Sequence, residues 1–370
     1  MPKSGSFSRF LSAVFLACLA GLAGTWGCQE SHEPVSPVFE RLDDSIPVRV
    51  YFTQPGLPAT DSRHPARALA HYISQARQTL DLCAHELDSA IITQAILEAH
   101  QRGVCVRVVT ETAYSDEDSI RRLKEAGIPV VHDQRDGALM HNKFIVLDNQ
   151  AVWTGSMNFT DNCTGRNDNH ALYIADARLA ENYATKFRWM FEQRRFGSPP
   201  GKLDRIPYPQ ITWDDGTLLE NYFAPHDRVA DKILLRVRQA TRSIRFLAFS
   251  FTHRGIADAM LERARQGVEV SGVFERRQAH AAHSMYQLFA SFGPPVQVYL
   301  DGNKYNMHHK LMILDGRVTI GGSFNWSMSA DKDNDENVII LHSEALAKQF
   351  EREFCRVFEQ ARSQTSLKDP

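Results

Sequence analysis

Short apolar runs alternate with longer amphipathic segments along most of the chain. The runs rich in apolar residues predict strands at 79–84, 104–109, 244–249 and 268–274. Segments with apolar side chains at helical spacing predict helices at 91–102 and 256–265, and a glycine follows each of them. Strands that alternate with helices in this way predict an α/β fold, in which a largely buried sheet is flanked by helices.

The same series of elements occurs twice. At an offset of 164 residues, nine positions between Ile92 and Glu111 carry the same residue again between Ile256 and Glu275. At an offset of 167 residues, the aromatic residues at 183, 187 and 191 recur at 350, 354 and 358, and their spacing is typical of a helix packed on a sheet. We therefore expect two homologous halves, 47–195 and 216–362, with a linker at 196–215 and a tail at 363–370.

Composition and charge narrow the class of protein. The 370 residues are 43% hydrophobic and 23% charged, which is typical of a globular chain long enough for two domains. The 42 basic and 44 acidic residues leave no excess of positive charge that would favour a nucleic-acid partner. The six cysteines are scattered along the chain, so we expect neither a disulfide framework nor a cysteine-rich metal site.

The N-terminal segment has the pattern of an export signal. Two basic residues precede an apolar run at 10–26, and this predicts a signal peptide at 1–27. The run ends just before Cys28 and resembles the cleavage box of bacterial lipoproteins, although Thr25 and Trp26 depart from it. We expect lipidation at Cys28, a tether at 28–46 and a membrane-anchored lipoprotein of the cell envelope. The alternatives are ordinary cleavage, which would give a periplasmic or secreted protein, and an uncleaved anchor.

A set of polar residues is repeated at matched spacing in the two halves. The first half contains His141, Lys143, Asp148, Ser156 and Asn158, and the second contains His308, Lys310, Asp315, Ser323 and Asn325. Alternate residues of a strand share one face, so each histidine and its lysine are expected to project together. Cleavage of a phosphodiester through a covalent intermediate needs a nucleophile, an acid for the leaving oxygen and positive charge on the other oxygens. Two such strands brought face to face supply all three without a metal.

These motifs resemble the signature of the phospholipase D superfamily. The resemblance implies two halves, each a mostly parallel or mixed sheet flanked by helices, packed with pseudo-two-fold symmetry around one active site. It implies His141, Lys143, His308 and Lys310 as catalytic residues and no cofactor or metal. Ser156, Asn158, Ser323 and Asn325 are expected to bind substrate. Asp148 and Asp315 are expected to be structural, each capping the turn that follows its strand.

The resemblance also implies a carboxylate that holds a catalytic imidazole of the opposite half in one tautomer. Glu336 matches this position in the second half, whereas Asn169 stands there in the first. Glu336 is therefore expected to orient His141, while His308 lacks a carboxylate unless Asp168 reaches it. A charged partner suits an imidazole that becomes a phospho-adduct, and a neutral partner suits one that gives up a proton. We expect His141 to be the nucleophile and His308 the general acid.

Two further groups are weaker candidates. His85 and Glu86 follow a strand that ends at the expected cleft, and they either shape access for the substrate or belong to a plain loop. The acidic run at 331–336 lacks the glycine and the downstream acid of a calcium-binding EF-hand. Apart from Glu336, this run is expected to be a solvated loop.

Three classes of function fit these observations. The leading one is a phospholipase D that hydrolyses a phosphatidylcholine-like lipid to phosphatidic acid through a phosphohistidine, or transfers the phosphatidyl group to an alcohol. The second is a metal-independent endonuclease, because the segments around Asn325 and Glu336 also resemble the compact endonuclease branch of the superfamily. The third is a catalytically inactive binding module, which the complete motifs disfavour. The expected partner is a phospholipid or membrane surface, with nucleic acid as the alternative and no obligate protein partner.

Overall fold

The computed structural model describes residues 47–198 and 205–366. The expected signal peptide at 1–27 and the tether at 28–46, with Cys28, lie outside the described residues. Within the described part of the chain, no helix combines the length and the apolar character that a membrane crossing requires.

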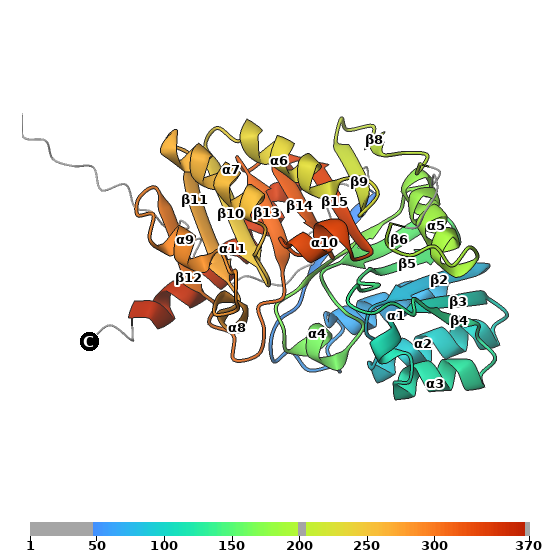
Figure 1. Ribbon diagram of the computed structural model, residues 1–370. Coiled ribbons are helices and arrows are strands. Elements are labelled where there is room, and N and C mark those ends of the chain that lie inside the picture. The colour runs from blue at the N-terminus through green and yellow to red at the C-terminus, as the bar shows by residue number, and fades with distance from the viewer. Residues whose placement is uncertain (1–46, 199–204, 367–370) are drawn as a thin grey trace, which may run out of the picture. The chain divides into compact units, whose positions relative to one another are not determined.

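The first half forms one sheet with helices on both sides (Figure 1). Its strands are β1 (Val48–Phe52), β2 (Thr79–Ala84), β3 (Cys105–Thr110), β4 (Val130–His132), β5 (Lys143–Leu147), β6 (Ala151–Gly155) and β7 (His170–Ile174). Its helices are α1 (Pro65–Gln75), α2 (Ala90–Gln101), α3 (Asp118–Glu125), α4 (Asp161–Gly165) and α5 (Ala177–Phe191), and a 3₁₀ turn, η1, spans Thr112–Tyr114.

The second half repeats this arrangement with one additional strand. Its strands are β8 (Gln210–Thr212), β9 (Leu218–Ala224), β10 (Ser243–Ala248), β11 (Glu269–Phe274), β12 (Val296–Leu300), β13 (Lys310–Leu314), β14 (Val318–Gly322) and β15 (Glu336–His342). Its helices are α6 (Val229–Gln239), α7 (Arg254–Arg265), α8 (Arg276–Ala279), α9 (Tyr286–Ala290), α10 (Met328–Lys332) and α11 (Glu344–Ser366). Two expected boundaries shift: β8 lies within the expected linker at 196–215, and α11 continues into the expected tail.

The two sheets share one strand order, which confirms the α/β fold with two homologous halves. The first sheet runs β1-β7-β6-β5-β2-β3-β4, and the second runs β9-β15-β14-β13-β10-β11-β12 with β8 beside β9. Each half was expected to contain a mostly parallel or a mixed sheet, and both sheets are mixed. Parallel pairing is confined to the edge where helices connect β2, β3 and β4, or their counterparts. The remaining pairs are antiparallel: a short turn connects β5 to β6, and a longer segment that includes α4 connects β6 to β7.

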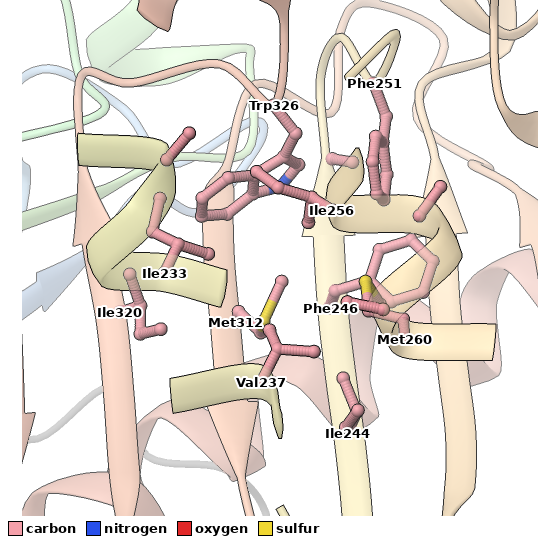
Figure 2. Packing of buried hydrophobic residues seen from close by; sticks show 14 of the residues in the cluster. Ile233, Val237, Ile244, Phe246, Phe251, Ile256, Met260, Met312, Ile320 and Trp326 are labelled. Carbon is pink, nitrogen blue, oxygen red and sulfur yellow. The ribbon is translucent and has the colours of Figure 1, made fainter. Parts of the chain in front are cut away.

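The core of each half lies between its sheet and the helices that cover it. In the second half, Ile233 and Val237 of α6 and Ile256 of α7 pack on Ile244 and Phe246 of β10 (Figure 2). Neighbouring strand residues point to the opposite face, where α11 contacts four consecutive strands, β12, β11, β10 and β13, and also β14 and β15. Burial on both faces explains why these strands are nearly continuous apolar runs.

Candidate active site

The two motif histidines lie just before the central strands β5 and β13. Lys143 and Lys310 are the first residues of these strands, and His141 and His308 precede them by two residues. The expectation that histidine and lysine share a strand is therefore wrong for the histidines. Backbone hydrogen bonds from the opposite half hold them instead. The His141 N–H donates to the Asp335 carbonyl at 3.0 Å, and the His308 N–H donates to the Asp168 carbonyl at 2.8 Å.

The two motif aspartates anchor the sheet at the far ends of β5 and β13. Asp148 accepts hydrogen bonds from the N–H groups of Arg77, Gln78 and Thr79 at 2.7–2.9 Å, just where β2 begins. Asp315 accepts from the corresponding N–H groups of residues 241–243 at 2.7–3.1 Å. Both residues are structural, but they fasten a neighbouring strand instead of capping their own turns. Their backbone φ angles of 51° and 55° are values that aspartate tolerates better than most residues.

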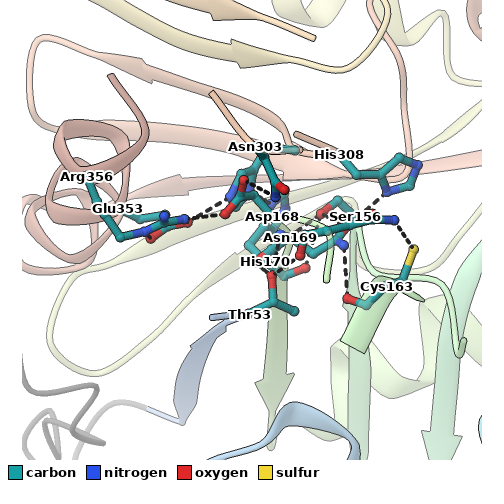
Figure 3. A network of polar contacts seen from close by, with 12 residues as sticks. Thr53, Ser156, Cys163, Asp168, Asn169, His170, Asn303, His308, Glu353 and Arg356 are labelled. Carbon is teal, nitrogen blue, oxygen red and sulfur yellow. Dashed lines mark hydrogen bonds and ion pairs between the residues drawn. The ribbon is translucent and has the colours of Figure 1, made fainter. Parts of the chain in front are cut away.

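Each imidazole is held by a side chain from the other half, and the two holders differ. Nδ1 of His141 lies 2.7 Å from Oε2 of Glu336. Nδ1 of His308 lies 2.9 Å from Oδ1 of Asn169 (Figure 3). Asp168 does not replace the missing carboxylate, because its own carboxylate binds Arg356 and Asn303. The expected pairing of Glu336 with His141 across the two halves is therefore present in the structure.

The two motif serines contact these holders and not an open pocket. Ser323 donates its hydroxyl proton to Oε2 of Glu336 at 2.6 Å. Ser156 donates to Oδ1 of Asn169 at 3.0 Å. A hydroxyl has one proton to donate, and in both serines a holder side chain accepts it, so the expected contact of these serines with substrate stays a prediction. In the structure they contact the side chains that contact the imidazoles.

The contacts of Asn169 define the protonation of His308. The amide nitrogen of Asn169 donates to the Cys163 carbonyl at 3.0 Å, so its oxygen is the atom that faces His308. Because that oxygen can only accept, Nδ1 of His308 carries a proton, and Nε2 is the ring nitrogen left for proton transfer. Asn158 and Asn325 behave differently, since their side-chain oxygens are buried and have no hydrogen-bond partner. They remain suited to contact a ligand.

Both lysines are buried and close to both imidazoles. Nζ of Lys143 donates to the His141 carbonyl at 2.5 Å, and Nζ of Lys310 donates to the His308 carbonyl at 2.9 Å. Burial lowers the pKa of Lys143 to about 8, against the opposing effect of Glu336. Burial and the charge of Lys143 together hold the pKa of Lys310 well below its usual value.

The two imidazoles are also driven toward the neutral form. Burial, followed by the charges of Lys143 and Lys310, holds the pKa of His141 well below its usual value. Burial and the same two lysines act in the same direction on the pKa of His308. Burial raises the pKa of Glu336 to about 7. An anion bound between the two lysines and the two histidines would favour the charged form of each of these four groups.

One aromatic ring packs against each imidazole, and these rings also differ. The His85 ring lies 4.7 Å from the His141 ring, at an interplanar angle of 73°. In the second half Phe249 packs on His308 at 4.6 Å, with Nζ of Lys310 4.6 Å from the centre of its ring. His85 is buried, and its Nδ1 lies 3.5 Å from Glu86. His85 is therefore part of the site and not of a plain loop.

The sequence expectations left Asp335 outside the site and considered Asp168 only as a possible carboxylate partner of His308. Asp335 belongs to the run that was expected to be solvated, yet it is fully buried and paired with Lys186 and Arg135. Asp331 of the same run is also buried, and its carboxylate accepts from the Ala230 N–H. The recurrence of aspartate at 168 and 335, at the motif offset of 167, is the signal that marks the pair.

Metal ligands do not gather at this site. Among the residues that the structure describes, no three histidine, cysteine, aspartate or glutamate side chains are placed to hold a metal ion together. Metal independence therefore stays a prediction about activity.

Comparison with known proteins identifies the family. Residues 69–191 and 233–358 match the family described as "Cardiolipin synthase, PLD-like domain", once in each half. The chain is 36% identical over 170 residues to the human protein named mitochondrial cardiolipin hydrolase, which covers 44% of this chain and 66% of that protein. It is 32% identical over 131 residues to a protein of Rickettsia bellii named phospholipase D, covering 35% and 64% of the two chains. The chain thus spans less than two thirds of each of these relatives.

Solved structures support the same fold over a larger part of the chain. The structure of phosphatidylserine synthase from Haemophilus influenzae superposes with a TM-score of 0.62 at 12% identity, covering 84% of this chain and 86% of that one. Polyphosphate kinase from Porphyromonas gingivalis superposes with a TM-score of 0.57 at 14% identity, covering 83% and 49%. At these identities the likeness extends to the fold alone, and it includes both halves.

Proposed function

Since the chain belongs to the family of phospholipase D-like domains described as "Cardiolipin synthase, PLD-like domain", we propose that it is a phosphodiesterase that cleaves the headgroup ester of phospholipids. The observation that carries this proposal is the pair of imidazoles with unlike partners, His141 on Glu336 and His308 on Asn169. Around them lie two buried ammonium groups whose pKa values are lowered by burial, and a phosphodiester would add an anion beside both.

The first chemical step uses the two imidazoles differently. Nε2 of His141 attacks phosphorus and forms a P–N bond while the P–O bond to the headgroup breaks. His308 gives its Nε2 proton to the departing oxygen. Glu336 accepts the Nδ1 proton of His141 and so balances the positive charge of the phosphorylated ring. Lys143 and Lys310 stabilise the non-bridging oxygens.

The second step restores the enzyme. Neutral His308 removes a proton from water, the oxygen of that water attacks phosphorus, and the P–N bond to His141 breaks while Glu336 returns the Nδ1 proton to the leaving imidazole. The products are phosphatidic acid and the free alcohol of the headgroup. An alcohol in place of water would give phosphatidyl transfer by the same route.

Two observations favour phospholipid over nucleic acid as substrate. The curated relatives are named for cardiolipin hydrolysis and for phospholipase D. Arg121 and Arg276, each the first of two adjacent arginines that could line a nucleic-acid path, are engaged within the chain: Arg121 pairs with Asp118, and Arg276 donates to the Asp301 carbonyl. Phosphatidylcholine and cardiolipin are the lipids to compare first.

We further propose that the chain acts at a membrane of the cell envelope, with Cys28 as its lipid anchor. The apolar run at 10–26 that ends next to Cys28 supports this placement. Radiolabelled palmitate should enter the wild type but not Cys28→Ser. Equal labelling of the two would exclude Cys28 as the acceptor.

The activity is tested on the purified full chain with vesicles of phosphatidylcholine and of cardiolipin. Thin-layer chromatography should show phosphatidic acid or phosphatidylglycerol as the lipid product, and activity should persist in excess EDTA. His141→Asn is the matched control and should lose both turnover and the labelled phospho-enzyme, by several orders of magnitude. Plasmid nicking without lipid cleavage would contradict the substrate class. Loss of activity in EDTA that a metal restores would contradict the mechanism.

A further inference from the structure

We propose that Asp168 and Asp335 are positioning residues, each of which holds the catalytic histidine of the opposite half in its working place. The proposal rests on the phosphodiesterase activity proposed above, and it assigns the position of each histidine to a buried aspartate that forms ion pairs across the two halves. Both aspartates are fully buried, and neither is within the two repeated motifs.

Asp335 of the second half is fastened to the first half by its side chain. Its Oδ1 lies 2.5 Å from Nζ of Lys186 on α5, and its Oδ2 lies 2.7 Å from Nη2 of Arg135. The backbone N–H of Gly197 donates to the same Oδ2 at 2.9 Å. A buried carboxylate with two cations and a backbone donor has little freedom to move.

The backbone of Asp335 forms the hydrogen bonds that hold the segment with the nucleophile His141. Its N–H donates to the Leu139 carbonyl at 2.8 Å, and its carbonyl accepts from the His141 N–H at 3.0 Å. The next residue, Glu336, binds Nδ1 of His141. His141 is therefore held from the opposite half at two points, its backbone N–H and its ring nitrogen.

Asp168 makes the matching arrangement with His308, but with fewer charges. Its Oδ1 lies 2.5 Å from Nη2 of Arg356 on α11, and its Oδ2 accepts from Nδ2 of Asn303 at 2.8 Å (Figure 3). Its carbonyl accepts from the His308 N–H at 2.8 Å. The next residue, Asn169, binds Nδ1 of His308.

The two anchors act on different steps because their histidines do. Displacing His308 weakens proton donation to the leaving oxygen, which an alkoxide needs and a p-nitrophenolate does not. Displacing His141 weakens attack on phosphorus, which every substrate needs. A purely structural role for the two aspartates would lower the rates with both kinds of substrate alike.

The experiment measures the first turnover with two substrates, bis(p-nitrophenyl) phosphate and short-chain phosphatidylcholine. For Asp168→Asn, we expect the nitrophenolate burst to stay within about 3-fold of wild type while choline release falls by roughly 10- to 100-fold, part of what general acid catalysis contributes. For Asp335→Asn, both rates should fall together. Asp81→Asn is the matched control, because Asp81 is a buried carboxylate held by Arg107 at 2.7 and 2.8 Å within the first half. It should leave the ratio of the two rates unchanged.

Asp335→Asn leaves Lys186 and Arg135 short of an anion and can fail to fold. The proposal is therefore judged on the ratio of the two rates in the Asp168 variants. The double variant Asp168→Asn with Arg356→Gln removes both charges of that pair and should show the same selective loss of choline release. An unchanged ratio of the two rates in both Asp168 variants would overturn the proposal. Absence of a burst in the wild type would instead contradict the proposed function. A wild-type burst without choline release would contradict the lipid substrate. The same comparison would then be made with a p-nitrophenyl ester of a nucleotide and an oligonucleotide as the two substrates.

Discussion

Glu336 and Asn169 occupy equivalent positions in the two halves and leave their imidazoles with different chemistry. A carboxylate on Nδ1 supports a ring that takes on positive charge, as the phosphorylated His141 would. The amide oxygen on Nδ1 of His308 is neutral and does not stabilise the protonated ring as a carboxylate would, so the ring releases its Nε2 proton more readily. The different roles of the two imidazoles, nucleophile and acid, then follow from the single side chain that contacts each ring.

Replacing the amide by a carboxylate tests this division. Asn169→Glu should raise the pKa of His308, because a negative charge beside the ring favours its protonated form. The alkaline limb of the pH profile of kcat/KM should then move upward by about one pH unit, since His308 must be protonated to act as the acid. Asn169→Gln keeps the amide and should leave the limb in place. An unmoved limb in Asn169→Glu would assign the acid to another group.

Lys143 tests the cost of the buried charge. Its pKa lies near 8 in the folded chain against 10.5 as the ordinary value, so at pH 7 its ammonium costs about 3 kcal/mol of stability. Lys143→Met should therefore raise the melting temperature by several degrees at pH 7 while abolishing turnover. Between pH 8 and 10.5 the Lys143 side chain binds its proton more tightly in the unfolded chain than in the folded one. The difference in melting temperature between Lys143→Met and wild type should therefore shrink as the pH rises through that range.

Lys186 provides the matched contrast for that measurement. It is as buried as Lys143 but paired with Asp335, so Lys186→Met should lower the melting temperature. A lower melting temperature for Lys143→Met as well would show that its ammonium is compensated in the folded chain.

At the scale of elements, the link between β5 and β2, and between β13 and β10, is a carboxylate that binds backbone N–H groups. Burial raises the pKa of Asp315, but its hydrogen bonds from residues 241–243 outweigh burial and leave the pKa below its ordinary 3.8. Asp315→Asn should cost about 1–2 kcal/mol at pH 7, because water partly screens this carboxylate. A lowered pKa gives stability that is lost as the pH falls, so urea melts should converge below pH 3.8. A cost that does not decline at all as the pH falls below 3.8 would point to packing.

Strand positions were predictable from the sequence to the extent that burial left a pattern. The run at 79–84 coincides with β2, because a strand buried on both faces is apolar along its length. β8 carries no such signal, since it has three residues and only Ile211 is buried. α11 extends beyond the expected end at residue 362 because helical spacing alone does not mark where a helix stops.

The site was predictable where the chain repeats itself and obscure where contacts are distant in sequence. The spacing of His141, Lys143 and their counterparts identified the chemistry. The position of Ser323 suggested a contact with phosphate, and only the fold shows that its hydroxyl donates a hydrogen bond to Glu336. The burial of Asp335 depends on Lys186, which is 149 residues away and in the other half.

At the scale of the whole molecule, the two halves are held together by many contacts that do not involve the linker. His170 and His309 stack at the boundary with ring centroids 5.4 Å apart, and Thr154 donates to Asn337 at 2.8 Å. A protease site inserted between residues 199 and 204 should therefore yield two fragments that co-elute on gel filtration and keep wild-type turnover. Fragments that separate under native conditions would assign the cohesion of the halves to the linker.

Asn169 and Glu336 stand at corresponding positions, and each serves a ring in the half to which it does not belong. In a pair of identical subunits, rotational symmetry would put the same residue beside both rings, so any change to one would be a change to both. Joining the two copies in one gene gives each position its own codon. Mutation and selection can then alter how the leaving alcohol is protonated while the attacking ring keeps its carboxylate, and every descendant inherits the unequal pair as a single trait.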